Sequence, residues 1–223
     1  MPGPPNRADR WLRPAAYAAA TVILLVLGAA LRPLILPDNA APARVLDGTE
    51  IGFAQDMTAH HQQAIQMVQR LDPGVDPAVR QLAQQIDDTQ RVEIGTMLGW
   101  LRLANAAPTS RHPMAWMRDG PDTAAAHHHS PTTTPAAPAT MPGMASMAEL
   151  DRLSAVRGRD AEILFLQLMY RHHQGGLTMA RAADRALPSG PVKEAARGMI
   201  TGQSQELGLM AVMLNQRGAQ PLP

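Results

Sequence analysis

The chain has 223 residues and a formal net charge of +1, so its charge gives no broad reason to expect binding to nucleic acid. It contains no cysteine, which excludes thiolate catalysis, cysteine-based zinc sites and disulfide bonds. Aromatic residues make up only 3% of the chain. Because β-sandwiches and barrels rely on aromatic and β-branched side chains, the composition favours an all-α fold.

An apolar run lies near the N-terminus. Residues 14–31 carry no charge, and three arginines precede them. At a rise of about 1.5 Å per residue the run is roughly 27 Å long, enough to cross the hydrocarbon core of a bilayer. The positive flank predicts that residues 1–13 are a cytoplasmic tail, that residues 14–36 are a single-pass anchor in the cell membrane, and that the C-terminal domain is extracytoplasmic. The alternative is a cleaved signal peptide, with the protein secreted.

A first helical hairpin is predicted over residues 48–105, after a connector rich in Pro and Ala at residues 37–47. Its first helix is expected to run from about Thr49, the N-cap, to Leu71, where an Asp-Pro-Gly sequence ends it. A proline at the first helical position opens the second helix, which carries apolar residues at helical spacing. The loop between them is short, so the two helices are expected to be antiparallel neighbours.

The segment over residues 106–145 is rich in Pro, Thr, Ala and His. It lacks the residues to bury a core and is predicted to be a flexible linker. Imidazole suits Cu(II), zinc and nickel, and thioether suits Cu(I), so the linker is also a candidate metal site. Its candidate ligands are His112, His127, His128, His129, Met114, Met117, Met141 and Met144. The alternative is that a low-complexity linker accumulates such residues without a function.

A second helical hairpin is predicted over residues 146–217, followed by a tail at residues 218–223. Ser146 and Glu149 have the spacing of a capping box and are expected to open a short helix ahead of it. A Pro-Ser-Gly-Pro turn separates its two long helices.

The two hairpins contain the same motif. Residues 53–67 and 165–179 share Phe, Met, His-His-Gln and Met at identical positions. The helix that follows each motif repeats a Gln-x-x-Glu pattern, so the whole hairpin is duplicated. Two amphipathic hairpins bury their apolar faces best against each other. The predicted fold is therefore an all-α four-helix bundle made of two αα-hairpins, with an N-terminal transmembrane helix.

Each His-His pair lies at the edge of the buried face of its helix. Met57 and His61 are four residues apart, which places their Cβ atoms about 5–6 Å from each other and lets both hold one ion. The second copy repeats this spacing. The following helix of each hairpin points a glutamate inward, and each glutamate needs a partner because a buried polar group without one costs about 1–3 kcal/mol. The candidate metal ligands are His60, His61, Met57, His172, His173 and Met169, with Glu93 and Glu206 as groups that hold these ligands in place.

Three interpretations of this pattern are open. In the first, the protein binds copper or a similar transition metal for storage, buffering or handover. In the second, the His–Glu network only stabilises the fold, or one His of each pair faces solvent, and the protein is a non-enzymatic structural or interaction module of the cell envelope. The third, an oxidase-like metalloenzyme, is disfavoured because the di-iron site of helical bundles needs Glu-x-x-His, which does not occur in this sequence. The expected partners are the membrane and a transition-metal ion.

The duplicated Phe-x3-Met-x2-His-His-Gln motif, with a Gln-x2-Glu helix after each copy, resembles the family called domain of unknown function 305. The resemblance covers residues 47–105 and 146–217. It implies a ferritin-like helical bundle in an exported bacterial protein, and some members of the family are linked to copper binding and copper tolerance. It carries over to the two His-His pairs and to the Met positions Met57, Met67, Met169 and Met179. The chain departs from the pattern in its long linker and at Gly175-Gly176, which replace the Gln-Ala of the first copy.

Overall fold

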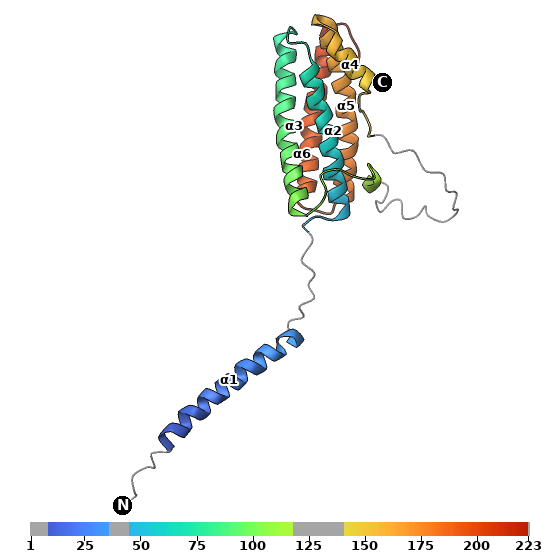
Figure 1. Ribbon diagram of the computed structural model, residues 1–223. Helices are drawn as coiled ribbons and strands as arrows, with labels where there is room; N and C mark the ends of the chain where they lie inside the picture. The colour runs from blue at the N-terminus through green and yellow to red at the C-terminus, as the bar shows by residue number, and fades with distance from the viewer. Residues whose placement is uncertain (1–8, 36–44, 118–140, 223) are drawn as a thin grey trace, which may run out of the picture. The chain divides into compact units, whose positions relative to one another are not determined.

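The computed structural model describes residues 9–35, 45–117 and 141–222 (Figure 1). These residues form six α-helices and one short 3-10 helix, and none of them forms a strand. The all-α prediction is confirmed. Helix α1 (Asp9–Ile35) belongs to a first unit that ends at residue 44, and the other helices form a second unit.

Helix α1 contains the apolar run. The side chains of residues 16–31 are all exposed, among them Leu24 and Leu25. Among the residues that the structure describes, no helix is long and apolar enough to cross a membrane. The predicted anchor over residues 14–36 is therefore not confirmed.

The first hairpin consists of α2 (Gly48–Arg70) and α3 (Pro77–Leu103). The N-cap of α2 is Asp47, two residues before the predicted Thr49. The Asp47 carboxylate accepts from the backbone N–H of Glu50 at 2.8 Å, and the Glu50 carboxylate accepts from the backbone N–H of Asp47 at 2.8 Å. This reciprocal capping box satisfies two donors at the start of the helix, which Thr49 could not do.

The second hairpin follows the short helix α4 (Met147–Ala155), which opens with the predicted capping box of Ser146 and Glu149. Its long helices are α5 (Gly158–Ala186) and α6 (Pro191–Gln216). Helix α2 packs against α3, α5 packs against α6, and α2 also packs against α5. Figure 1 shows these four long helices running side by side.

The apolar core of the second unit is divided into two clusters. The first apolar cluster contains Met67 of α2 and Met169 of α5, and the second contains Phe53 of α2 and Met179 of α5. On each of the four long helices, polar residues stand in the chain between the members of one cluster and the members of the other. We call these residues the polar layer: His60, His61, Gln90, Glu93, His172, His173, Gln203 and Glu206.

The described ends of the predicted linker, residues 106–117 and 141–145, contact helix α2. Ala107 accepts a hydrogen bond from the side chain of Gln55 at 2.7 Å. The 3-10 helix η1 (Ala115–Met117) follows, and its Trp116 ring packs edge-on against Phe53 at 5.5 Å between centroids. Aromatic packing and hydrogen bonds thus connect residues 106–117 and 141–145 to the helices, and flexibility over the whole of 106–145 stays a prediction. Residues 118–140 lie outside the described part of the chain.

Asp56 of α2 holds the first of these segments. Its buried carboxylate accepts from the backbone N–H of Met114 at 2.6 Å and from the indole N–H of Trp116 at 2.9 Å. Burial raises the pKa of Asp56, while the two hydrogen bonds lower it. Nothing in the local sequence indicated this contact, since the partners are about sixty residues apart in the chain.

We expect Asp56→Ala to lower the free energy of unfolding by about 2–4 kcal/mol, because it leaves two buried donors without an acceptor. Asp56→Asn keeps an acceptor oxygen at the same place and should lose much less. Urea unfolding followed by circular dichroism measures both, with the exposed Asp88→Ala as a control expected to stay within about 0.5 kcal/mol of the parent. Equal stability of Asp56→Ala and the parent would contradict the assignment.

Candidate functional site

The four histidines of the duplicated motif lie in the interior. His60 and His61 of α2 and His172 and His173 of α5 are each at most 1% exposed. The alternative in which one His of each pair faces solvent is wrong, because all four side chains are buried. The rings of His60 and His172 stack with centroids 3.8 Å apart and planes tilted by 30°.

One histidine of each pair binds the glutamate of its own hairpin. His61 Nε2 lies 2.7 Å from Glu93 Oε2, and His173 Nε2 lies 2.8 Å from Glu206 Oε2. The duplicated sequence thus produces a duplicated contact, with the partner expected from the helical pattern. Both imidazoles are fully buried, and the Glu206 side chain is only 10% exposed.

The other two histidines are not in equivalent settings. His60 Nε2 donates to the carbonyl oxygen of Pro142 at 3.1 Å, whereas His172 Nε2 donates to the carbonyl oxygen of His60 at 3.0 Å. Burial, together with the charge that neighbouring His61 carries when protonated, lowers the pKa of His60 to about 3. Burial and the nearby His60 lower the pKa of His172 well below its ordinary value. Both rings are therefore neutral at neutral pH.

These contacts decide the tautomers. A carbonyl oxygen or a carboxylate accepts, so Nε2 carries the proton in all four rings. In the neutral rings of His60 and His172 the lone pair is then on Nδ1. In the described part of the chain, the Nδ1 atoms of all four histidines are buried and have no hydrogen-bond partner.

Two glutamines of the polar layer share this condition. Gln90 of α3 is 2% exposed, and neither its Oε1 nor its Nε2 has a partner among the described residues. Gln203 of α6 has an unpartnered Oε1. The sequence showed Gln90 as the first residue of the repeated Gln-x-x-Glu pattern and gave no sign that its amide would lack partners.

A strap formed by residues 141–145 covers the histidines where α2 meets α5. The side-chain amide of Gln63 both accepts from Ala145 N at 2.6 Å and donates to Ala145 O at 2.8 Å. Gly143 has φ +78°, and a Cβ there would lie 2.4 Å from the carbonyl oxygen of Arg171. A Cβ on Gly175 of α5 would lie 1.9 Å from the carbonyl oxygen of Pro142. The replacement of Gln by Gly in the second copy was the sequence signal of this close approach.

The two predicted sulfur ligands both lie in the apolar core. Met57 and Met169 are fully buried, Met57 in the second apolar cluster and Met169 in the first. Within residues 9–35, 45–117 and 141–222, no group of three or more His, Cys, Asp or Glu side chains could hold a metal ion.

The candidate linker site is divided. Met114 is buried in the second apolar cluster, so it packs as a core residue, and His112 is exposed. Met117, Met141 and Met144 are half-buried. His127, His128 and His129 lie outside the described residues.

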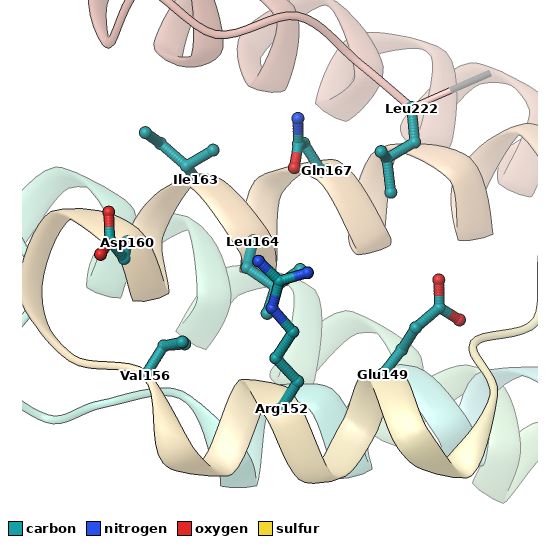
Figure 2. Close-up of a pocket in the computed structure, with 8 residues that line it drawn as sticks. All are labelled: Glu149, Arg152, Val156, Asp160, Ile163, Leu164, Gln167 and Leu222. Carbon is teal, nitrogen blue, oxygen red and sulfur yellow. The ribbon is translucent and has the colours of Figure 1, made fainter.

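A pocket of about 370 Å³ lies between α4 and α5, apart from the polar layer (Figure 2). Its wall combines charged Glu149, Arg152 and Asp160 with apolar residues that include Leu222 near the C-terminus. Glu149 is already engaged by Arg171 at 2.8 Å. No residue that the sequence predicted to bind a ligand lines this pocket.

Comparison with known proteins agrees with the sequence pattern. Two solved structures of relatives are similar over nearly their whole length. One is a DUF305 protein from Streptomyces coelicolor, with 38% identity, a TM-score of 0.66, and coverage of 78% of this chain and 96% of that one. The other is a DUF305 fragment from Deinococcus radiodurans, with 30% identity, a TM-score of 0.59, and coverage of 76% and 97%. No curated protein matches the chain. The model of the family described as domain of unknown function (DUF305) matches residues 50–214, and the chain belongs to that family.

Proposed function

We propose that this is an exported protein whose polar layer binds a transition-metal ion, copper above all, for storage, buffering or handover. One observation carries the proposal: four buried imidazoles direct their Nε2 protons to fixed acceptors, and their four Nδ1 atoms have no partner among the residues that the structure describes. Metal-ligating histidines characteristically donate the proton of the second ring nitrogen to a carboxylate or a backbone carbonyl. The contacts of His61 with Glu93 and of His173 with Glu206 have this form.

The buried side-chain nitrogen and oxygen atoms that have no hydrogen-bond partner among the described residues favour a cation over an anion. Within the described part of the chain, six such atoms, the four Nδ1 atoms and two amide oxygens, can present a lone pair to an ion, and Gln90 Nε2 cannot. Each buried polar atom without a partner costs about 1–3 kcal/mol, so an occupant that accepts lone pairs relieves several of these costs together. A cation does this, and an anion does the opposite.

Copper fits the available donors better than harder ions. The chain has no thiolate and has no described cluster of three carboxylates and imidazoles. Imidazole pairs supplemented by thioether suit copper, with Cu(I) accepting few and soft ligands. Met57 precedes His61 by one helical turn, and Met169 precedes His173 in the same way. Both sulfurs are buried in the adjoining core.

We also infer the surroundings of this site. The packing of the four long helices around one divided core supports a ferritin-like four-helix bundle. The exposed apolar side chains of residues 16–31 support a membrane tether or an export signal at residues 14–36. The relative from Streptomyces coelicolor is described as a candidate secreted protein, which supports the extracytoplasmic location. Fusion of residues 1–47 to alkaline phosphatase, which is active only after export, tests that location. An inactive fusion would contradict it.

Metal titration of the full chain in detergent tests the binding function. We expect stoichiometric binding of Cu(I) or Cu(II), measured by competition with a chromophoric chelator, and its loss in the double variant His61→Ala/His173→Ala. The exposed His112→Ala is the control and should bind as the parent does. Retained binding in the double variant, with loss after deletion of residues 118–140, would move the site to the linker. No binding by the parent, with strong destabilisation of the double variant, would support the structural module instead.

A further inference from the structure

The polar layer contains two glutamines, Gln90 and Gln203, besides its histidines and glutamates. Gln90 and Gln203 both stand three residues before the glutamate that binds a histidine, which puts each amide one helical turn from that glutamate. In the second hairpin the structure fixes the place more closely. Gln203 Oε1 lies 2.4 Å from the position that a Cβ on Gly176 would occupy, so only a glycine leaves room for it there. Gly176 follows His173 on α5 by three residues, so the amide oxygen contacts α5 within about one helical turn of the second His-His pair.

The duplication extends the argument to the first hairpin. Gly176 corresponds to Ala64, which follows His61 by three residues. Helices α2 and α3 are packed together, and Glu93 of α3 already contacts His61. Gln90 is one turn from Glu93 on the side of the short interhelical loop, which places it at the level of Ala64. Each His–Glu pair is thus accompanied by one buried glutamine.

A buried glutamine whose role was only to stabilise the fold would be expected to form hydrogen bonds with both polar atoms of its amide. Among the residues that the structure describes, neither polar atom of the buried Gln90 side chain has a partner, and Gln203 Oε1 has none either. Native proteins pair the large majority of buried side-chain polar atoms, and an exception calls for a specific reason such as an absent ion. A leucine of similar size would serve a purely structural purpose better at either position.

We propose that Gln90 and Gln203 are metal-site residues, each supplying an amide oxygen beside the imidazoles of its own hairpin. This inference rests on the proposed function and adds to it. An oxygen donor next to imidazole favours Cu(II) over Cu(I), since amide oxygen is a harder ligand than thioether. The glutamines therefore set the preference between the two oxidation states.

Two quantities measured on Gln90→Leu, Gln203→Leu and the double variant test the proposal. The Tm of the metal-free protein should rise by several degrees, because each substitution removes unpaired buried polar atoms. The dissociation constant for Cu(II) should rise by about tenfold or more, with a smaller change for Cu(I). Gln85→Leu and Gln205→Leu are matched controls on the exposed faces of α3 and α6, and they should change neither quantity in this way. Gln90→Glu keeps an oxygen donor and should retain Cu(II) binding.

The outcomes separate this inference from the proposed function. If the parent protein binds neither Cu(I) nor Cu(II), the proposed function fails. If the parent binds and the leucine variants bind Cu(II) with unchanged affinity, only the role of the glutamines fails. A lower Tm of the metal-free leucine variants, or their failure to fold, also overturns the inference, because it means that the amides are satisfied within the metal-free fold.

Discussion

Acidification from pH 7 to pH 4 is expected to destabilise the metal-free protein strongly. Burial lowers the pKa of His60 to about 3 in the folded state, while an unfolded histidine has a pKa of about 6.5. Between these two pKa values, the imidazole of His60 is protonated in the unfolded chain and neutral in the folded protein. The stability from this group is fully present above pH 6.5 and is lost as the pH falls toward 3.

The magnitude is large for a single group. A difference of about three to four pKa units in one ionisation corresponds to on the order of 5 kcal/mol, and whole domains are stable by only about 5–15 kcal/mol. The pKa of His172 is lowered for the same reason, by burial. The two rings are stacked, so protonation of either one opposes protonation of the other, and their contributions are expected to be coupled.

The pH window identifies the groups responsible. The carboxylates with a pKa below the ordinary range, Asp72, Glu149 and Asp184, lose their contribution only below about pH 4.5. For Glu149 the main cause is its hydrogen bond with Arg171, and its pKa is about 2. A fall in stability between pH 6.5 and pH 5 therefore reports the buried histidines.

Urea midpoints measured by circular dichroism at pH 7, 6 and 5 follow this loss in the metal-free protein. In His60→Gln the slope of stability against pH should become shallower, since the amide does not titrate. The exposed His112→Gln should leave the slope unchanged. A parent protein with equal stability at pH 7 and pH 5 would show that the imidazoles take up protons in the folded state.

The sequence predicted the parts of the structure that repeat. Apolar spacing and proline placement indicated the four long helices, and the copied motif indicated that Glu93 and Glu206 would face histidines of their own hairpins. These features depend on neighbours within one hairpin, where helical geometry and a short loop fix the relation between residues. Local pattern was sufficient to predict them.

The features that sequence reasoning missed depend on chain segments far apart. The duplicated motif gave no sign that His60 and His172 would have different partners, yet His60 donates to Pro142 of the strap and His172 donates to the backbone carbonyl of His60. The strap contacts the two copies of the motif through different residues, so the surroundings of the two His-His pairs differ although their sequences repeat. The contact of Asp56 with Met114 and Trp116 escaped prediction for the same reason.

The strap also explains why the two copies of the motif differ after their histidines. In the first copy Gln63 reaches out and binds both backbone groups of Ala145. In the second copy the equivalent residue is Gly175, and the absence of a Cβ lets the backbone of Pro142 lie directly on α5. Glycine in a helix interior costs about 1 kcal/mol relative to alanine, so the close approach of Pro142, and not helix propensity, explains a glycine at position 175.

Gly175→Ala is therefore expected to destabilise the protein by about 3 kcal/mol or more, although alanine is the better helix former. Its Cβ would lie 1.9 Å from the carbonyl oxygen and 2.4 Å from the carbonyl carbon of Pro142. Those atoms are backbone, so relief requires the strap to leave α5, and His60 then loses its acceptor. Urea unfolding measures the loss.

Two other glycines supply the matched controls. Gly95 of α3 and Gly208 of α6 have open space where a Cβ would be built, so their replacement by alanine should stabilise the protein by up to about 1 kcal/mol. Opposite signs at chemically identical substitutions would place the cost in the contact with the strap. If Gly175→Ala stabilised the protein as the controls do, the strap would not rest on α5, and the burial of His60 and His172 would need another cover. Reaction of the histidines with diethyl pyrocarbonate decides between these cases, because lifting the strap exposes His60 to the reagent while an intact cover protects it.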